Sequence, residues 1–238
     1  MALIFNFAAL IIRALVVQQN NKRTIKEIWV EALQEPKTRS KILLASVVTI
    51  FILSGMPFFF GYIEKRNGVV LNDWLLARIP SYNVSIIIFA LIWGMGGLIV
   101  SRALYNPNIY IRYAWTLFFV NLTRMATILL FALNPPHGMV YLIDPISGIF
   151  YGNKVITKDL FYSGHTSTMV LVFLCLEKRR DKIISFIATI SVMVLLLIQH
   201  IHYTIDVLAA PVFVYIIFLI TNRFLKLQNP PKSVGNNA

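Results

Sequence analysis

Charged residues and cysteine are both scarce in this sequence. Only 13% of its 238 residues are charged and 58% are hydrophobic, which excludes an ordinary soluble domain. The single cysteine, Cys175, excludes an intramolecular disulfide and a metal site built from several cysteines. Acidic residues number 10 against 22 basic ones, but the basic residues sit in breaks between apolar runs, so nucleic acid is not the expected partner. We predict a polytopic membrane protein of the all-α class.

Six apolar runs have the length of transmembrane helices, which is about 20 residues for a hydrocarbon core of roughly 30 Å. We predict that residues 41–225 form a six-helix transmembrane catalytic domain and that residues 226–238 are a disordered tail. The six runs cover about residues 41 to 63, 84 to 104, 111 to 133, 160 to 176, 181 to 201 and 203 to 224.

The first 40 residues are predicted to form amphipathic helices on the membrane surface. The apolar stretch Ala2–Val17 contains Arg13, has no basic segment before it, and as a helix would be about 24 Å long, too short to span. The polar stretch at residues 20–41 is predicted to contain a second helix, which ends at Pro36. Its apolar residues recur at helical spacing, namely Ile25, Ile28, Trp29, Ala32 and Leu33.

The distribution of Lys and Arg predicts the orientation. If the six runs all span, 16 of the 22 basic residues lie on the side of the two termini and 5 on the other side. By the positive-inside rule both termini are then cytoplasmic. Compact size and short loops favour a bacterial inner membrane. The long loop at residues 134–159 falls on the non-cytoplasmic side, where we expect a lid or an entrance.

Two polar clusters interrupt the apolar sequence, at residues 159–166 and 202–206. The fourth run begins, and the fifth returns, on the non-cytoplasmic side. His165 of the first cluster and His202 of the second are therefore expected on the same face of the membrane. This placement predicts a single site made from both clusters.

The spacing within the clusters suggests acid–base and nucleophilic chemistry. His202 and Asp206 are four residues apart, so they share a helical face if the sixth helix begins near His202. The carboxylate can then fix the tautomer of the imidazole and stabilise its positive charge. His165 can approach from the facing helix. Ser163 and Gly164 precede it, and the glycine lets a substrate or a neighbouring backbone come close.

Arg124 lies inside the third run, about nine residues before its non-cytoplasmic end. An arginine within a span costs about 2.5–3.5 kcal/mol on insertion scales, so it is expected to face the interior with an anionic partner. A substrate phosphate fits, since a guanidinium binds phosphate with two parallel hydrogen bonds. A structural ion pair with Asp206 or Asp159 is the alternative.

A metal site made of His165, His202, Asp206 and Asp159 is conceivable from the ligand types alone. No tight metal-ligand spacing supports such a site, so we predict neither a metal nor another cofactor. His200 lies two positions before His202 and is expected to point elsewhere, at the level of the lipid head groups.

Several segments resemble the sphingomyelin synthase family, a branch of the phosphatidic acid phosphatase type 2 superfamily. Residues 159–166 and 199–207 look like its two catalytic motifs. Residues 124–127 resemble its Arg-x-x-Thr segment and residues 133–136 its proline-rich segment. The resemblance covers about residues 60–225 and implies six spans with an outward-facing site.

The resemblance also implies roles for individual residues. His202 would be the nucleophile on phosphorus, Asp206 would orient it, and His165 would handle the leaving-group proton. Arg124 is expected to stabilise charge on the phosphoryl oxygens. Asp159 is expected to orient His165 or the incoming hydroxyl, and with Ser163 and Gly164 it completes the predicted substrate-binding set.

The sequence departs from the family's pattern in places. Thr157 and Lys158 stand where the family often has Cys-Gly, and Leu195 and Leu196 stand where the superfamily's phosphatases have Ser-Arg. The absence of the phosphatases' Ser-Arg favours the synthase branch. The partners predicted are a phospholipid donor and a lipid hydroxyl such as that of ceramide. Water as acceptor, in a lipid phosphatase or phospholipase C-like hydrolase, and a non-enzymatic lipid-binding protein are the alternatives.

Overall fold

The computed structural model describes residues 23–142 and 156–226. Within these two segments every regular element is a helix, apart from one isolated bridge between Val69 and Leu133. The all-α class is therefore confirmed for the described residues. The elements are α2 (Ile25–Gln34), α3 (Pro36–Ile63), the short 3-10 helix η1 (Leu76–Arg78), α4 (Ser85–Tyr105), α5 (Pro107–Leu130), α7 (Gly164–Cys175), α8 (Arg179–Ile198) and α9 (Thr204–Phe224).

Five helices, α3, α4, α5, α8 and α9, are long and apolar enough to cross a membrane, which indicates an integral membrane protein. The expected sixth span is not confirmed. The fourth apolar run, predicted over residues 160 to 176, forms only the 12-residue helix α7. At ~1.5 Å per residue α7 is about 18 Å long, well short of a hydrocarbon core of roughly 30 Å.

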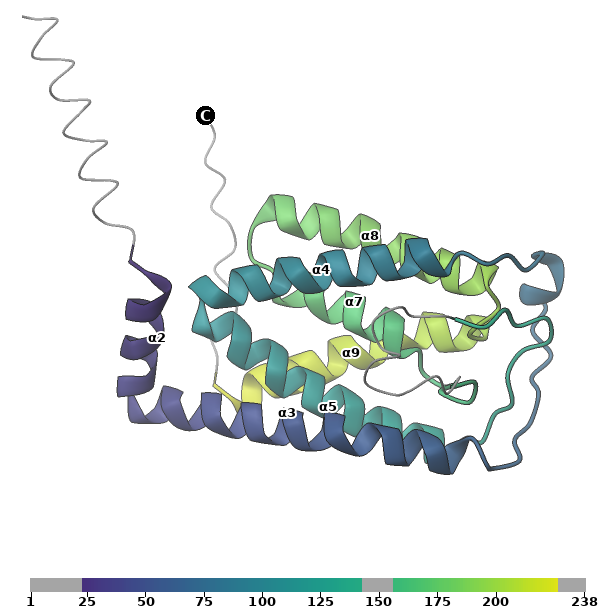
Figure 1. The fold of residues 1–238 in the computed structure, drawn as a ribbon, viewed down its shortest axis with the longest axis horizontal. Coiled ribbons are helices and arrows are strands. Elements are labelled where there is room, and N and C mark those ends of the chain that lie inside the picture. Colours follow the sequence, from purple (N-terminus) through teal and green to yellow (C-terminus); the bar gives the residue numbers. More distant parts are fainter. Residues whose placement is uncertain (1–22, 143–155, 227–238) are drawn as a thin grey trace, which may run out of the picture.

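The short helix α7 lies in the interior of the bundle (Figure 1). It packs against α4, α5, α8 and α9, and most of its residues are buried. Residues 159–163, which precede it, are not helical and are held by hydrogen bonds to α5. Non-helical backbone is tolerated at membrane depth where it is buried in protein, so the neighbouring helices allow α7 to begin inside the bundle.

Helix α2 lies across one end of the bundle (Figure 1). Thr24 and Glu27 form a reciprocal capping box at its start. The Trp29 indole donates a hydrogen bond to the carbonyl oxygen of Leu104 at 2.9 Å and packs edge-on against Tyr110. Part of the apolar stripe that predicted a membrane-surface helix is therefore used for packing within the protein.

Pro36 separates α2 from α3, but the boundary differs from the prediction. Helix α2 ends at Gln34, and Pro36 is the first residue of α3, where the missing N–H would have no partner in any case. The first span thus begins five residues earlier than the expected residue 41. The predicted helix at residues 2–17, the disordered tail after residue 226, and residues 143–155 of the predicted lid lie outside the described residues.

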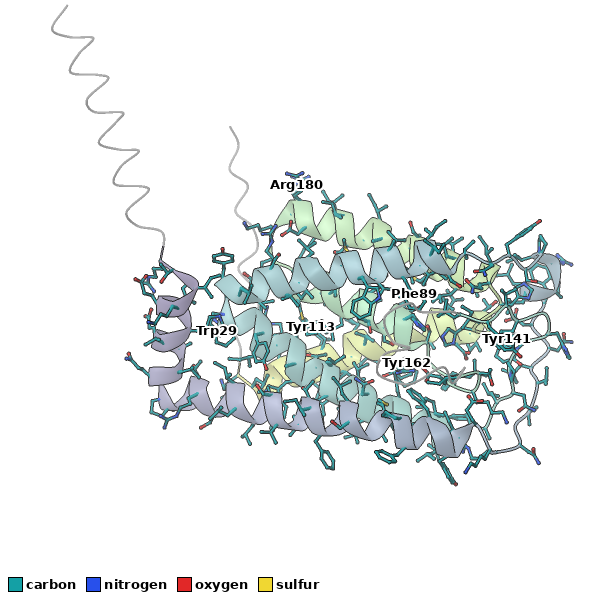
Figure 2. All side chains as sticks on the ribbon, in the orientation of Figure 1. Trp29, Phe89, Tyr113, Tyr141, Tyr162 and Arg180 are labelled. Carbon is teal, nitrogen blue, oxygen red and sulfur yellow. The ribbon has the colours of Figure 1, made fainter. Side chains whose placement is uncertain are left out.

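One end of the bundle carries α2, and the other end carries the long loops. Trp29 and Arg180 lie at the end beside α2, whereas Tyr141 lies among the long loops at the opposite end (Figure 2). At the α2 end, Arg102 donates hydrogen bonds of 2.6 and 3.1 Å to the two carboxylate oxygens of buried Asp181. This bidentate pair ties α4 to α8.

The turn between α4 and α5 is tighter than predicted. Only Asn106 separates the two helices, and its side chain accepts a hydrogen bond from Asn108 N at the start of α5. Helix α5 thus begins four residues before the predicted residue 111, and Arg112 lies inside it and is buried. Its Nε donates to Asn222 of α9 at 3.1 Å, and its Nη1 lies 3.6 Å from Glu177.

Candidate active site

His165 is the second residue of α7. Ser163 caps this helix, because its Oγ accepts a hydrogen bond from Thr166 N at 3.3 Å. Ser163 N also donates to the backbone carbonyl of Asp206 at 3.1 Å, so the starts of α7 and α9 are joined directly. Ser163 is fully buried. Its contacts are those of a helix cap that fixes the position of His165.

His202 lies in the short linker between α8 and α9, two residues before α9 begins. Its Nδ1 is 3.5 Å from Asp206 Oδ2, and both side chains are buried. The same carboxylate oxygen accepts a hydrogen bond from Tyr203 N at 3.2 Å. Asp206 therefore folds back over the helix start and reaches His202, although His202 itself precedes the helix. Because Nδ1 faces the carboxylate, Nε2 points to the other side of the ring.

The structure brings the two polar clusters together. The rings of His165 and His202 meet edge-on, with centroids 6.0 Å apart and planes at 63°. The ring of Phe89, from α4, packs edge-on against His165 at 6.3 Å. Figure 2 labels Phe89 and also Tyr162, from the segment before α7. Phe89 lies in a continuous apolar run, so no pattern in the sequence marks it as a neighbour of His165.

Arg124 is buried in α5 and is bound to the segment before α7. Its Nη2 donates to Asp159 Oδ1 at 2.5 Å, and its Nε donates to the carbonyl oxygen of Tyr162 at 3.1 Å. The alternative of a structural ion pair with Asp159 therefore holds in this structure. A guanidinium has five N–H donors, and these bonds use two of them.

Gly164 is in contact with this guanidinium. A Cβ atom at Gly164 would lie 2.7 Å from Cζ and Nη2 of Arg124 and 2.8 Å from its Nη1. The glycine thus permits a close approach, as predicted, but the group that approaches is a neighbouring side chain. Arg124 consequently lies directly against the residue that precedes His165.

The structure gives a reason for the spacing of the Arg-x-x-Thr segment. Arg124 and Thr127 are three residues apart on one face of α5. Thr127 Oγ1 donates to the carbonyl oxygen of Phe161 at 2.9 Å, next to the carbonyl that Arg124 binds. Both side chains hold the non-helical segment that leads into α7. Thr127 was not among the predicted site residues, although its spacing from Arg124 was a signal.

The position of His200 at the level of the lipid head groups stays a prediction, but its side chain is enclosed by protein. His200 is buried, with Nε2 2.8 Å from the carbonyl oxygen of Ile79 and Nδ1 3.1 Å from that of His137. These two carbonyls belong to the loops after α3 and after α5. The linker that carries His202 is therefore enclosed between two loops, which turns the His200 ring inward.

The described residues contain no group of three or more His, Cys, Asp or Glu side chains placed to hold a metal ion. Of the four candidate ligands, Asp159 is paired with Arg124, whereas His165, His202 and Asp206 lie together. The arrangement is a pair of adjacent imidazoles, one with a carboxylate beside it, next to a buried guanidinium. Such a set can supply a nucleophile, a proton donor or acceptor, and positive charge.

Residues 158–223 match the family model of the PAP2 superfamily C-terminal domain. This segment contains His165, His202 and Asp206, whereas Arg124 lies outside it. The match supports the phosphatidic acid phosphatase type 2 superfamily and an enzyme that acts on phosphate esters. No curated protein matches the chain. The five apolar helices support association with a membrane, and the match is consistent with a lipid substrate.

Proposed function

We propose that the chain is a membrane lipid phosphotransferase of the sphingomyelin synthase type. It would move the phosphorylated head group of a phospholipid to a lipid hydroxyl, such as that of ceramide, through a phosphohistidine intermediate. The observation that supports this proposal most directly is that the ring centroids of His165 and His202 are 6.0 Å apart, with Asp206 beside His202. The motif resemblance and the family match over residues 158–223 support the same chemistry.

In the first step, His202 Nε2 attacks the phosphorus of the donor phospholipid. The bond from phosphorus to the diacylglycerol oxygen breaks, and His165 gives that oxygen a proton. The products are diacylglycerol and a head-group phosphoryl bound to His202. Asp206 stabilises the positive charge on the imidazole ring and holds Nδ1, so that Nε2 stays aimed at phosphorus.

In the second step, the hydroxyl of the acceptor lipid attacks the same phosphorus. His165, now without its proton, takes the proton of this hydroxyl, and the P–N bond to His202 breaks. Both histidines return to their starting states, so the cycle balances. Arg124 supplies positive charge for the phosphoryl oxygens, and Asp159 holds its guanidinium beside the start of α7.

The absence of the phosphatase Ser-Arg, replaced by Leu195 and Leu196, supports the transferase over a hydrolase. The side chains of His202 and Asp206 are 2% and 0% exposed, so the site must open to admit either acceptor, a lipid hydroxyl or water. A lipid phosphatase or phospholipase C-like hydrolase is the second candidate, because the matched superfamily comprises phosphoesterases.

The decisive experiment is turnover by the purified full chain in detergent micelles that contain mixed phospholipids, with and without ceramide. Mass spectrometry should detect diacylglycerol together with a head-group-modified ceramide. His202→Ala should abolish both products. His137→Ala is the matched control, because its side chain is exposed in the loop and only its backbone carbonyl makes a contact near the site.

Two results would contradict the proposal. Release of a water-soluble phosphorylated head group at the same rate with or without ceramide would point to the hydrolase. Unchanged turnover in His202→Ala would remove the phosphohistidine step. The intermediate itself can be sought by quenching the enzyme without acceptor and measuring the mass of the peptide that contains His202.

We also propose that the site faces the non-cytoplasmic side of a bacterial inner membrane, with both termini in the cytoplasm. The concentration of basic residues at the α2 end of the bundle supports this orientation. A single cysteine introduced at exposed Tyr82, in the loop before α4, should react with a membrane-impermeant maleimide in intact spheroplasts. Labelling that requires lysed cells would reverse the orientation.

A further inference from the structure

Asp73, in the loop between α3 and α4, binds the start of α9 from outside the two polar clusters. Its Oδ2 accepts a hydrogen bond from Thr204 N at 2.6 Å, and its Oδ1 accepts one from Thr204 Oγ1 at 3.0 Å. Oδ1 also accepts from Leu75 N and Leu76 N, both at 3.1 Å. The carboxylate therefore orders its own loop and holds the first residue of α9 at the same time.

This contact provides a hydrogen-bond acceptor for a backbone N–H at the start of a helix. The first N–H groups of a helix have no partner within the helix, and a negative charge beside them is favourable. At α9 the Tyr203 N–H is bound by Asp206 and the Thr204 N–H by Asp73. The two amides that directly follow His202 are thus held by two carboxylates, one from α9 itself and one from a distant loop.

We propose that Asp73 is a positioning residue for His202, an inference that rests on the proposed function. Tyr203 and Thr204 are the two residues that directly follow His202 in the chain that leads to Asp206. The distance from His202 Nδ1 to Asp206 Oδ2 is 3.5 Å, at the long end for a contact of this kind. A small movement of the start of α9 therefore changes the distance between His202 and Asp206, and Asp73 fixes the position of that start.

A second contact from the same loop supports this view. Leu71 N donates to the Tyr203 hydroxyl at 3.1 Å, and that hydroxyl donates to the carbonyl oxygen of Asn134 at 2.9 Å. Tyr203 is fully buried. The loop after α3 thus holds two consecutive residues beyond His202.

Asp73 remains ionised at neutral pH. Burial raises the pKa of Asp73, but the hydrogen bonds from Thr204, Leu76 and Leu75 outweigh it and leave the pKa below its ordinary value of 3.8. For a carboxyl group with a lowered pKa, the stabilisation is present above the ordinary value and is lost as the pH falls through the lowered one. The hydrogen bonds between Asp73 and Thr204 at the start of α9 therefore persist across the neutral pH range.

The test compares Asp73→Ala, Asp73→Asn, Thr204→Val and the double variant Asp73→Ala/Thr204→Val in the full chain. Turnover of phospholipid with ceramide should fall about tenfold to a hundredfold in Asp73→Ala, with KM unchanged, because a displacement of about 1 Å at a reacting group can cost a hundredfold. Asp73→Asn keeps one acceptor oxygen and should lose less. The double variant should lose no more than Asp73→Ala alone, because Thr204→Val removes only the hydroxyl bond, which Asp73→Ala already removes together with the bond to Thr204 N.

Three controls separate positioning from other roles. Asn106→Ala removes a comparable helix cap at the opposite end of the bundle and should lower the unfolding temperature without changing kcat. The shape of the pH profile in the neutral range should be the same in Asp73→Asn as in the wild type. Hydrogen exchange of the peptide that begins at Tyr203 should be faster in Asp73→Ala.

Each contrary result has a distinct meaning. Wild-type kcat in both Asp73→Ala and Asp73→Asn, while His202→Ala is inactive, overturns the inference and leaves the proposed function standing. A raised KM with unchanged kcat, or a displaced pH profile, assigns Asp73 to substrate binding or proton transfer and also overturns it. A wild-type enzyme that does not turn over phospholipid overturns the inference together with the proposed function.

Discussion

Replacement of Gly164 by alanine tests whether the position of the Arg124 guanidinium is required for turnover. The new methyl group would lie 2.7 Å from Cζ and Nη2 of Arg124. Ordinary contact begins at 3.4 Å, so the guanidinium must retreat by about 0.7 Å. It would move relative to Asp159 and to the Tyr162 carbonyl, its two present partners.

The expected change in stability is small and the expected change in rate is large. Alanine within a helix is favoured over glycine by up to about 1 kcal/mol. A hydrogen bond to a charged group contributes about 1.5–3 kcal/mol, and the two bonds of Arg124 would be weakened rather than lost. The free energy of unfolding should therefore stay within about 2 kcal/mol of the wild type. A shift of this size at a group that stabilises the phosphoryl oxygens should lower kcat about tenfold to a hundredfold.

The assay is phospholipid turnover in micelles, measured together with thermal unfolding in the same detergent. Gly94→Ala in α4 is the matched control, because a Cβ atom there meets nothing within 4 Å. This control should keep wild-type kcat. A folded Gly164→Ala protein that turns over at the wild-type rate would refute the reasoning, since the guanidinium would then be free to move without consequence.

Three further changes have expected outcomes. Asp206→Asn keeps the size of the side chain but removes its charge, so kcat should fall about 10²–10⁴-fold with little change in the unfolding temperature; a normal rate would exclude a role for this charge beside His202. His200→Ala removes the ring N–H that donates to one of the two backbone carbonyls in contact with the ring, at a cost of about 1–3 kcal/mol, which thermal unfolding should detect; an unchanged unfolding temperature would show that this contact is dispensable. Asp181→Asn weakens the pair with partly exposed Arg102 and should lower the unfolding temperature while leaving kcat unaltered below it; a loss of rate in the folded protein would indicate coupling between the two ends of the bundle.

The apolar runs predicted most of the helices correctly because burial in lipid imposes a simple composition over about 20 residues. Helix α4 begins within one residue of its predicted start and α9 does the same. The fourth run failed this rule. Its residues are apolar because they are buried among other helices, and composition does not distinguish burial in protein from burial in lipid. The length of α7 was therefore beyond the reach of the sequence.

The candidate site, too, could be predicted from the sequence only in part. The four-residue step from His202 to Asp206 and the charge pattern were enough to predict that the two polar clusters meet, and the rings do lie together. The partner of Arg124 stayed open between phosphate and carboxylate. A guanidinium accepts either anion, and only the folded chain places Asp159 against it.

The sequence by itself determined that this is a helical membrane protein and which polar residues interrupt its spans, because both follow from local composition and spacing. Only the tertiary structure decided that α7 is a short interior helix, that His200 is enclosed between two loops, and that Asp73 binds the start of α9. Asp73 and Thr204 are separated by 131 residues. Contacts across such distances depend on how the helices pack, and no local pattern in the chain records that packing.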